Sequence, residues 1–310
     1  MNPILSVCIP TYNSAGYLRQ TLESVLTQSF TDYELVIVDN ASQDGTVALV
    51  KSIADPRIRL HQNPQNVGAL ENHNVCLRAA AGKYIKFFCS DDIMLPGTLQ
   101  KMVDALNQHP NVGLVVFNPM VTLEDLTPVS VRHHYPGMAN GEAVIKASLD
   151  RAFNFLGGPS DVMFRKGLLG SLRFDPQYKW WGDFRFFAQY LLQSKSDYFN
   201  LDEVGSYYRL HNQSDTAVSC PPAVKARNVY DFIAEMSAFN HLNSLKLLLQ
   251  PVGFRRRLHL TGWLLRHAFD FRTIAFLFKQ RPVGPDGSLA DRLQQKLFFW
   301  RQSSFRNGSQ

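Results

Sequence analysis

The chain has 310 residues, of which 45% are apolar and 12% aromatic, and its net charge is +6. Such a chain can bury a large α/β core and carry a further helical region, which excludes a disordered linker or tail. The charge is uneven, because residues 221–310 carry +9 and residues 1–220 carry −3. We therefore expect a globular domain over residues 1–220 and a basic, amphipathic helical region over residues 221–310.

Short runs that suit β-strands alternate with amphipathic segments in the first part of the chain. The runs predict strands at residues 4–10, 34–39, 57–61 and 84–88. Apolar residues at helical spacing predict helices between them, at residues 15–28, 44–54 and 68–81. This order predicts an α/β fold with a mostly parallel, doubly wound sheet, whose ligand site lies at the carboxyl ends of the strands.

The second part of the chain is less regular. A helix at 96–108 and a strand at 112–117 precede an irregular stretch, 118–160, in which His133-His134-Tyr135-Pro136-Gly137 predicts an exposed loop. The remaining elements expected in the domain are a helix and two strands, at residues 183–193, 197–201 and 204–210. Pro221-Pro222 marks the expected boundary with the helical region.

Cysteine usage and hydropathy bear on where the protein acts. No spacing suits a zinc site or a disulfide framework among the four cysteines, Cys8, Cys76, Cys89 and Cys220. No apolar run approaches the roughly 18–20 residues that span a bilayer, and no signal sequence is evident. We expect a cytoplasmic protein. Its basic C-terminal region has Arg255-Arg256-Arg257 beside apolar residues. This region lies on the inner face of the membrane, binds a polyanionic glycan or nucleic acid, or forms an ordinary solvated helix face.

Polar side chains follow three of the predicted strands, in Pro10-Thr11-Tyr12-Asn13, Asp39-Asn40 and Ser90-Asp91-Asp92. We expect these clusters to meet at one edge of the sheet. Adjacent buried aspartates repel each other and lose hydration, so Asp91-Asp92 is costly without a cation. Mg²⁺ or Mn²⁺ held there would suit a diphosphate ligand. Alternatively, Asp92 caps the next helix and Asp91 is solvated.

Common sequence motifs of nucleotide-binding proteins and hydrolases are missing from the chain. The chain lacks a P-loop, a GxGxxG sequence after the first strand and a GxSxG elbow. The usual signals for nucleoside triphosphate hydrolysis, dinucleotide binding and α/β-hydrolase chemistry are therefore missing.

Five ordered motifs lie within about a hundred residues. They are Ser6-Val7-Cys8-Ile9-Pro10-Thr11-Tyr12-Asn13, Val36-Ile37-Val38-Asp39-Asn40-Ala41-Ser42 with Asp44-Gly45-Thr46, Asn66-Val67-Gly68, Gly82-Lys83-Tyr84-Ile85, and Ser90-Asp91-Asp92 before Pro96. In order and spacing, these motifs resemble those of family 2 glycosyltransferases. The resemblance implies the GT-A fold, a Rossmann-like mixed sheet flanked by helices, and a nucleotide-sugar donor. It places the donor nucleotide against Pro10, Thr11, Tyr12, Asn13, Asp39, Asn66, Gly68, His73 and Asp91.

Within that set the resemblance implies individual roles. Thr11 and Tyr12 lie against the nucleobase, and Asp39 accepts a hydrogen bond from it. Asp91 and Asp92 engage the ribose and the metal-bound diphosphate. Tyr208-Arg209-Leu210-His211 resembles the family's C-terminal basic motif, which makes His211 a metal ligand beside Asp91 and Asp92, unless it is purely structural.

The acceptor side is expected later in the chain. Trp181-Gly182-Asp183 resembles the general-base position of the family, and an inverting transfer needs such a carboxylate to deprotonate the acceptor hydroxyl. A simple helix cap is the alternative for Asp183. Trp180 and Trp181 are candidates for stacking on an acceptor sugar, and Gly158 for shaping its cleft. Core packing and an ordinary turn are their alternatives.

The sequence departs from the family pattern at two places. The first bears on a strict metal requirement, and the second on one contact with the donor. Cys89 stands where many members carry an aspartate, and His73-Asn74 where many carry Arg-Asn.

The whole sequence predicts an inverting glycosyltransferase of the hexosyl or N-acetylhexosaminyl type that uses Mg²⁺ or Mn²⁺. We expect it to transfer a sugar, from UDP in preference to dTDP or GDP, to a glycan or lipid-linked oligosaccharide in surface polysaccharide assembly. No nucleic-acid partner is expected. The alternatives are a nucleotidyltransferase and a nucleotide- or glycan-binding module without catalysis.

Overall fold

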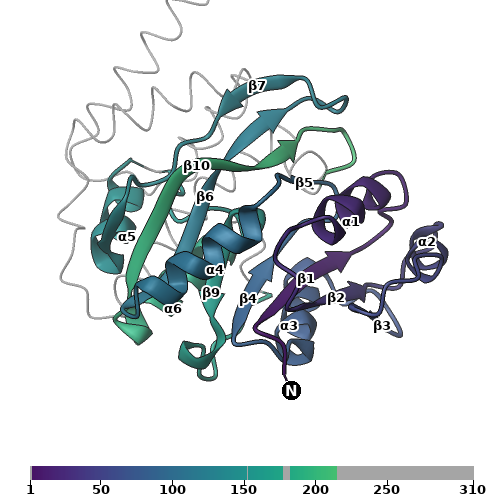
Figure 1. The fold of residues 1–310 in the computed structure, drawn as a ribbon, viewed down its shortest axis with the longest axis horizontal. Coiled ribbons are helices and arrows are strands. Elements are labelled where there is room, and N and C mark those ends of the chain that lie inside the picture. The colour runs from purple at the N-terminus through teal and green to yellow at the C-terminus, as the bar shows by residue number, and fades with distance from the viewer. Residues whose placement is uncertain (1, 152, 177–181, 215–310) are drawn as a thin grey trace, which may run out of the picture. The chain divides into compact units, whose positions relative to one another are not determined.

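The computed structural model describes residues 2–151, 153–176 and 182–214. Their strands form one mixed sheet flanked by helices (Figure 1), which confirms the predicted α/β class. One half of the sheet holds four parallel strands, in the order β3 (Ile58–Gln62), β2 (Tyr33–Asp39), β1 (Leu5–Thr11) and β4 (Tyr84–Phe87). These are the four strands predicted from the first part of the sequence.

The other half of the sheet mixes strand directions. β9 (Val162–Arg165) runs antiparallel to β4 and to β6 (Val112–Thr122). β10 (Asp197–Arg209) lies parallel to β6, and β5 (Ile93–Met94) pairs antiparallel with β10. One edge of the sheet therefore holds the carboxyl ends of the strands that run in the same direction, β1, β2, β4, β6 and β10.

Five helices of the described residues agree with predicted ones, four of them with shorter ends and the last one residue longer at each end, whereas the helix at 141–151 was not predicted. The helices are α1 (Leu18–Leu26), α2 (Thr46–Lys51), α3 (Ala69–Ala79), α4 (Thr98–Gln108), α5 (Gly141–Arg151) and α6 (Gly182–Ser194). In Figure 1 the ribbon of α4 crosses in front of the central strands. It begins two residues later than predicted, because Gly97 at its N-cap has a φ of +79°, outside the helical region.

The stretch from 118 to 160 is more regular than predicted. β6 continues to Thr122, and two short strands follow, β7 (Pro128–Val131) and β8 (Met138–Asn140), before α5 and the 3₁₀ turn η1 (Pro159–Asp161). The residues of β7 are mostly exposed, so they lack the apolar alternation that reveals a strand in sequence. The exposed loop predicted at 133–137 is wrong for His134, which is buried because its ring bonds to a carboxylate described below.

The two faces of the parallel strands bury different partners. In β1, Leu5, Val7 and Ile9 join the core that includes α1 and α4. Cys8 faces α3 instead, and its thiol donates to the carbonyl of Cys76 at 3.9 Å. Burial on both faces accounts for the nearly continuous apolar runs of these strands.

Several predicted features lie outside the described residues: the basic C-terminal region with Arg255-Arg256-Arg257, the Pro221-Pro222 boundary, Trp180, Trp181 and Cys220. Within the described part of the chain, none of the helices has the length and apolarity needed to cross a bilayer.

Candidate functional site

The first two strands of the parallel group end side by side. β1 and β2 are in register through Thr11 and Asp39, and the amide of Asn40 donates to the Thr11 carbonyl at 2.9 Å. Thr11 and Asp39 are each 1% exposed. Asp39 Oδ2 accepts from the amide of Ser42 at 3.1 Å, whereas Oδ1 has no partner among the described residues. A buried oxygen of this kind is available to a donor on a ligand.

The loops beyond these strands hold each other in place. The amide of Asn13 donates to Ser42 Oγ at 2.9 Å, and the amide of Gln43 donates to Asn13 Oδ1 at 2.8 Å. Asn13 has a φ of +48°, a left-handed conformation that asparagine tolerates. Tyr12 is 48% exposed and Pro10 is half-buried. The structure thus brings together the first group of predicted donor residues at this edge.

A network of asparagine side chains positions the loop before α3. Asn40 Nδ2 donates to Asn66 Oδ1 at 2.9 Å, and the amide of Gly68 donates to the same oxygen at 2.9 Å. Asn63 Nδ2 donates to Asn40 Oδ1 at 3.0 Å and to Asn72 Oδ1 at 2.8 Å. Gly68 has a φ of +86°, which glycine adopts without strain. Asn66 and Gly68 therefore shape the loop, and sequence reasoning missed Asn63 and Asn72.

His73 packs within aromatic surroundings on α3. Its ring lies 5.0 Å from that of Phe87 and 5.1 Å from that of Phe174, and its Nδ1 bonds with the carbonyl of Ala69 at 2.8 Å. These contacts hold the ring against β4. Its donor contact stays a prediction.

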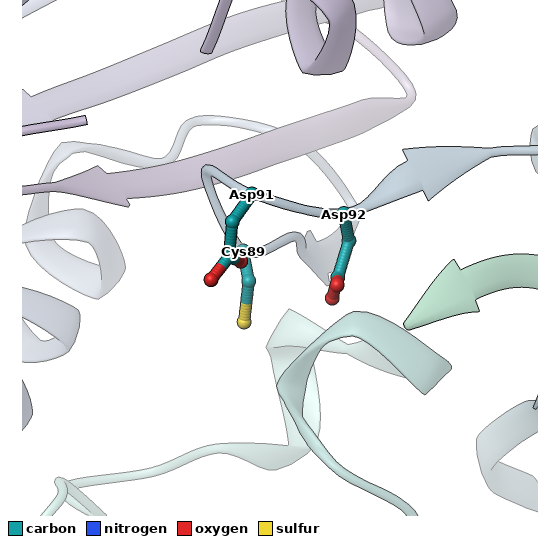
Figure 2. Close-up of side chains that lie close together, drawn as sticks. All are labelled: Cys89, Asp91 and Asp92. Carbon is teal, nitrogen blue, oxygen red and sulfur yellow. The ribbon is translucent and has the colours of Figure 1, made fainter. Parts of the chain in front are cut away.

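An acidic cluster follows β4. The ligand atoms of Cys89, Asp91 and Asp92 all lie within 4.8 Å of one another, and their side chains project to the same side of the turn (Figure 2). Asp92 is 1% exposed, and its Oδ1 accepts from the amide of Arg209 at 3.1 Å. Its Oδ2 has no partner within the described ranges. The alternative that Asp92 caps a helix is wrong, because α4 begins at Thr98 and Gly97 is its N-cap.

Electrostatics make this cluster receptive to a cation. Burial, followed by the charge of Asp91, raises the pKa of Asp92 well above its ordinary value. Burial, followed by the charges of Asp92 and Asp91, also raises the pKa of the Cys89 thiol. The thiol is therefore neutral at physiological pH, and the two carboxylates are the oxygen ligands that Mg²⁺ or Mn²⁺ prefers. The unpartnered Asp92 oxygen fits such an ion.

The end of β10 closes the cluster against α1. His211 Nε2 bonds with Asp91 Oδ2 at 2.9 Å, and the His211 side chain is 4% exposed. Its ring lies 4.3 Å from that of Tyr17, and the Arg209 guanidinium lies 5.0 Å from the same ring. His211 is thus in the cluster, as predicted. Its role as a metal ligand stays a prediction, since its Nε2 is engaged by Asp91.

Asp183 lies in the first turn of α6, where the helix presses on α3. A Cβ on Gly182 would lie 2.7 Å from Leu70 Cδ1. Burial raises the pKa of Asp183, the amide of Phe184 opposes that rise, and the charge of Asp161 adds to it. A carboxylate with a raised pKa is a stronger base, which suits the predicted role.

The turn η1 carries charged groups that sequence reasoning missed. His134 Nε2 bonds with Asp161 Oδ2 at 3.0 Å, and their side chains are 1% and 6% exposed. The amide of Gly158 donates to the same Asp161 oxygen at 2.9 Å, which places Gly158 at this turn. The ammonium of Lys86, buried in β4, donates to the carbonyl of Ser160. The one sign of these buried charged groups in the sequence was a lysine, Lys86, inside an otherwise apolar strand.

Comparisons with known proteins add to this geometry. The family model described as Glycosyl transferase family 2 matches residues 6–168. The putative teichuronic acid biosynthesis glycosyltransferase TuaG of Bacillus subtilis is 27% identical over 230 residues, 74% of this chain and 87% of TuaG. The putative glycosyltransferase EpsE of the same organism is 36% identical over 124 residues, 37% of this chain and 45% of EpsE. The chain spans about half the length of the curated relatives that it matches first, or less.

Solved structures share the fold. TarS of S. aureus in complex with UDP superposes with a TM-score of 0.59 at 21% identity, covering 91% of this chain and 76% of that one. The mannosyltransferase PcManGT of Pyrobaculum calidifontis, in complex with GDP-Man and Mn²⁺, gives a TM-score of 0.55 at 18% identity, covering 96% and 79%. These likenesses confirm the predicted GT-A fold.

The raised pKa of Asp92 predicts a gain in stability when its charge is removed. Asp92 binds a proton more tightly in the folded chain, so it stabilises the fold below its unfolded pKa of about 3.9. That contribution is lost as the pH rises toward the folded pKa. Asp92→Asn should therefore raise the melting temperature of the metal-free protein at pH 7 and leave it nearly unchanged near pH 4.

Melting curves of both proteins at the two pH values, with chelator present, check this expectation. Asp104→Asn in α4, where the carboxylate accepts from Gln100 at 2.9 Å, is the matched control and should show no such gain. A lower melting temperature of Asp92→Asn at pH 7 would contradict the assignment.

Proposed function

Since the chain belongs to glycosyl transferase family 2, whose model matches residues 6–168, we propose that it transfers a sugar from a nucleotide-sugar donor to a glycan or lipid-linked acceptor. The observation that carries the proposal is the meeting of Asp39, the Asp91-Asp92 turn and His211 at one edge of the sheet. Surface polysaccharide assembly is the proposed setting. Its support is the similarity to TuaG and to the minor teichoic acid biosynthesis protein GgaB of B. subtilis, 24% identical over 259 residues.

The proposed donor is a UDP-sugar. The N3–H of uracil is a hydrogen-bond donor that suits the unpartnered Oδ1 of Asp39, and the exposed Tyr12 offers a ring for stacking. TarS, which shares the fold, has been solved with UDP and with UDP-GlcNAc. A hexose or an N-acetylhexosamine is the proposed sugar.

The proposed chemistry is an inverting displacement. Asp183 takes the proton of the acceptor hydroxyl as that oxygen bonds to the anomeric carbon, and the bond from this carbon to the diphosphate breaks. Asp91 and Asp92 would hold Mg²⁺ or Mn²⁺, with His211 beside them. When bound, the ion supplies positive charge to the departing diphosphate. The buried surroundings that raise the pKa of Asp183 strengthen it as a base.

Nucleotide binding tests the donor assignment. UDP should raise the melting temperature of the protein more than GDP or dTDP does, because a ligand that binds the folded form stabilises it. Asp39→Asn should weaken UDP binding about tenfold or more. The asparagine keeps only one accepting oxygen, so either the Ser42 amide or the uracil N3–H loses its acceptor.

Asp32→Asn is the matched control, since Asp32 is exposed and directly precedes β2, away from the end that carries Asp39. Calorimetric titration of UDP measures both variants. Equal affinities of Asp39→Asn and the wild type would remove Asp39 from the base contact.

Transfer tests the role of Asp183. Asp183→Asn should lose transfer by about 10²-fold or more while retaining UDP affinity, because the amide cannot accept the proton. Release of nucleoside diphosphate in the presence of Mn²⁺ measures turnover. Full activity of the variant would exclude Asp183 as the base, and a wild type that binds UDP without turnover would favour a binding module.

The acceptor is proposed to be presented at a membrane surface. Residues 221–310 carry a charge of +9, with Arg255-Arg256-Arg257 next to apolar residues, a composition that suits anionic lipid. Co-sedimentation with vesicles that contain phosphatidylglycerol should be lost when residues 245–310 are removed and reduced by raised salt. Undiminished binding of the truncated chain would show that this region is not the anchor.

A further inference from the structure

Tyr17, the N-cap residue of α1, contacts both basic side chains at the end of β10. The centroid of its ring lies 4.3 Å from that of the His211 ring, at an interplanar angle of 40°. The Arg209 guanidinium lies 5.0 Å from the same centroid. An aromatic face attracts a guanidinium and packs well against a second ring, so one side chain of α1 supports two side chains of the site.

The two basic residues differ in what else fixes them. Arg209 is anchored independently of Tyr17, because its Nη2 donates to Gln20 Oε1 at 2.7 Å. The His211 ring has one hydrogen bond within the described residues, to Asp91 Oδ2 at 2.9 Å, and its buried Nδ1 has no partner there. A single hydrogen bond fixes the position of Nε2 but not the tilt of the ring. The face of Tyr17 therefore sets that tilt.

The Tyr17 ring is itself tied to the loop 123–127, between β6 and β7. Its hydroxyl donates to Glu124 Oε1 at 2.5 Å. This hydrogen bond, followed by burial, raises the pKa of Tyr17, so the hydroxyl remains the donor. The start of the loop is fixed to the end of β10, because the amide of Leu210 donates to the Thr122 carbonyl at 2.8 Å. The tyrosine thus lies between this support and the histidine.

We propose that Tyr17 is a positioning residue of the donor site, which sets the orientation of the His211 ring on Asp91 and takes its own position from Glu124. This inference rests on the proposed function, in which the acidic turn serves the diphosphate and the ends of β1 and β2 serve the base. The effect of Tyr17 therefore falls on the diphosphate end of the donor. Tyr17 acts through His211 without touching the donor.

Two nucleotides separate a positioning role from a structural one in the full chain. In the presence of Mn²⁺, Tyr17→Leu should weaken UDP binding about tenfold and change UMP binding by less than about twofold, because UMP lacks the terminal phosphate. Tyr17→Phe keeps the ring and loses only the bond with Glu124, so it should weaken UDP binding about two- to threefold. Titration calorimetry measures both affinities.

Tyr33→Leu is the matched control, because the Tyr33 ring at the start of β2 also carries an arginine, with the Arg57 guanidinium 4.7 Å from its centroid. This variant should lower the melting temperature and leave the ratio of UDP to UMP affinity as in the wild type. His211→Ala supplies a second comparison. Adding Tyr17→Leu to His211→Ala should weaken UDP binding by less than about twofold more, since Tyr17 acts through the histidine.

Equal weakening of UDP and UMP by Tyr17→Leu, or no weakening of either, would overturn the positioning role. Losses that add in the double variant would show that the effect does not pass through His211, and would overturn it as well. If Tyr17→Leu does not fold, Tyr17→Phe supplies the same comparison of nucleotides and the same double variant.

A wild type that binds neither nucleotide would refute the proposed function instead. The positioning role then has its own readout, the chemical shifts of the His211 ring nitrogens, measured by NMR without nucleotide and assigned with His211→Ala. These shifts should change in Tyr17→Leu and stay as in the wild type in Tyr33→Leu. Unchanged shifts in Tyr17→Leu would show that the tyrosine does not orient the ring.

Discussion

Asp92 is a carboxyl group removed from water and placed next to a second carboxylate, and the surrounding elements meet that electrostatic constraint. The amide of Arg209 donates to one of its oxygens. From α1, the hydroxyl of Thr21 donates to the carbonyls of Ser90 and Asp92, at 3.0 and 2.9 Å, which fixes the backbone of the turn. The ammonium of Lys86 donates to the carbonyl of Ser160, whose hydroxyl accepts from the amide of Cys89 in the same turn. Contacts with the turn at Asp92 therefore join α1, the strand before the turn and β10.

The sequence predicted the first half of the fold well, because strands buried on both faces leave long apolar runs and the helices between them keep amphipathic spacing. The second half was harder to predict. β7 is mostly exposed, and β9 has only four residues, so neither gives a clear pattern. The sequence predicts two strands in place of β10, because the exposed Asp202 and Glu203 interrupt its apolar pattern. There Asp202 has a φ of +54° and the register with β6 shifts.

Site residues were predictable where topology alone places them. Thr11 and Asp39 end two parallel strands and the Asp91-Asp92 turn follows a third, and the carboxyl ends of such strands meet at one edge of the sheet. His134 and Asp161 were missed because their contact joins two irregular segments, and no local pattern reports such a pairing. The family model ends at residue 168, so the match does not extend to Asp183 and His211.

The bond from Arg209 to Asp92 spans 117 residues of sequence. At ordinary elongation rates a ribosome needs roughly 6 to 23 s to synthesise that length. Throughout this interval the nascent chain already contains both aspartates, Lys86 and the strands that flank them, yet lacks the amide that completes their surroundings. The edge proposed to bind the nucleotide is therefore completed by β10, the last strand of the described residues, and fragments released earlier in translation lack the amide that donates to Asp92.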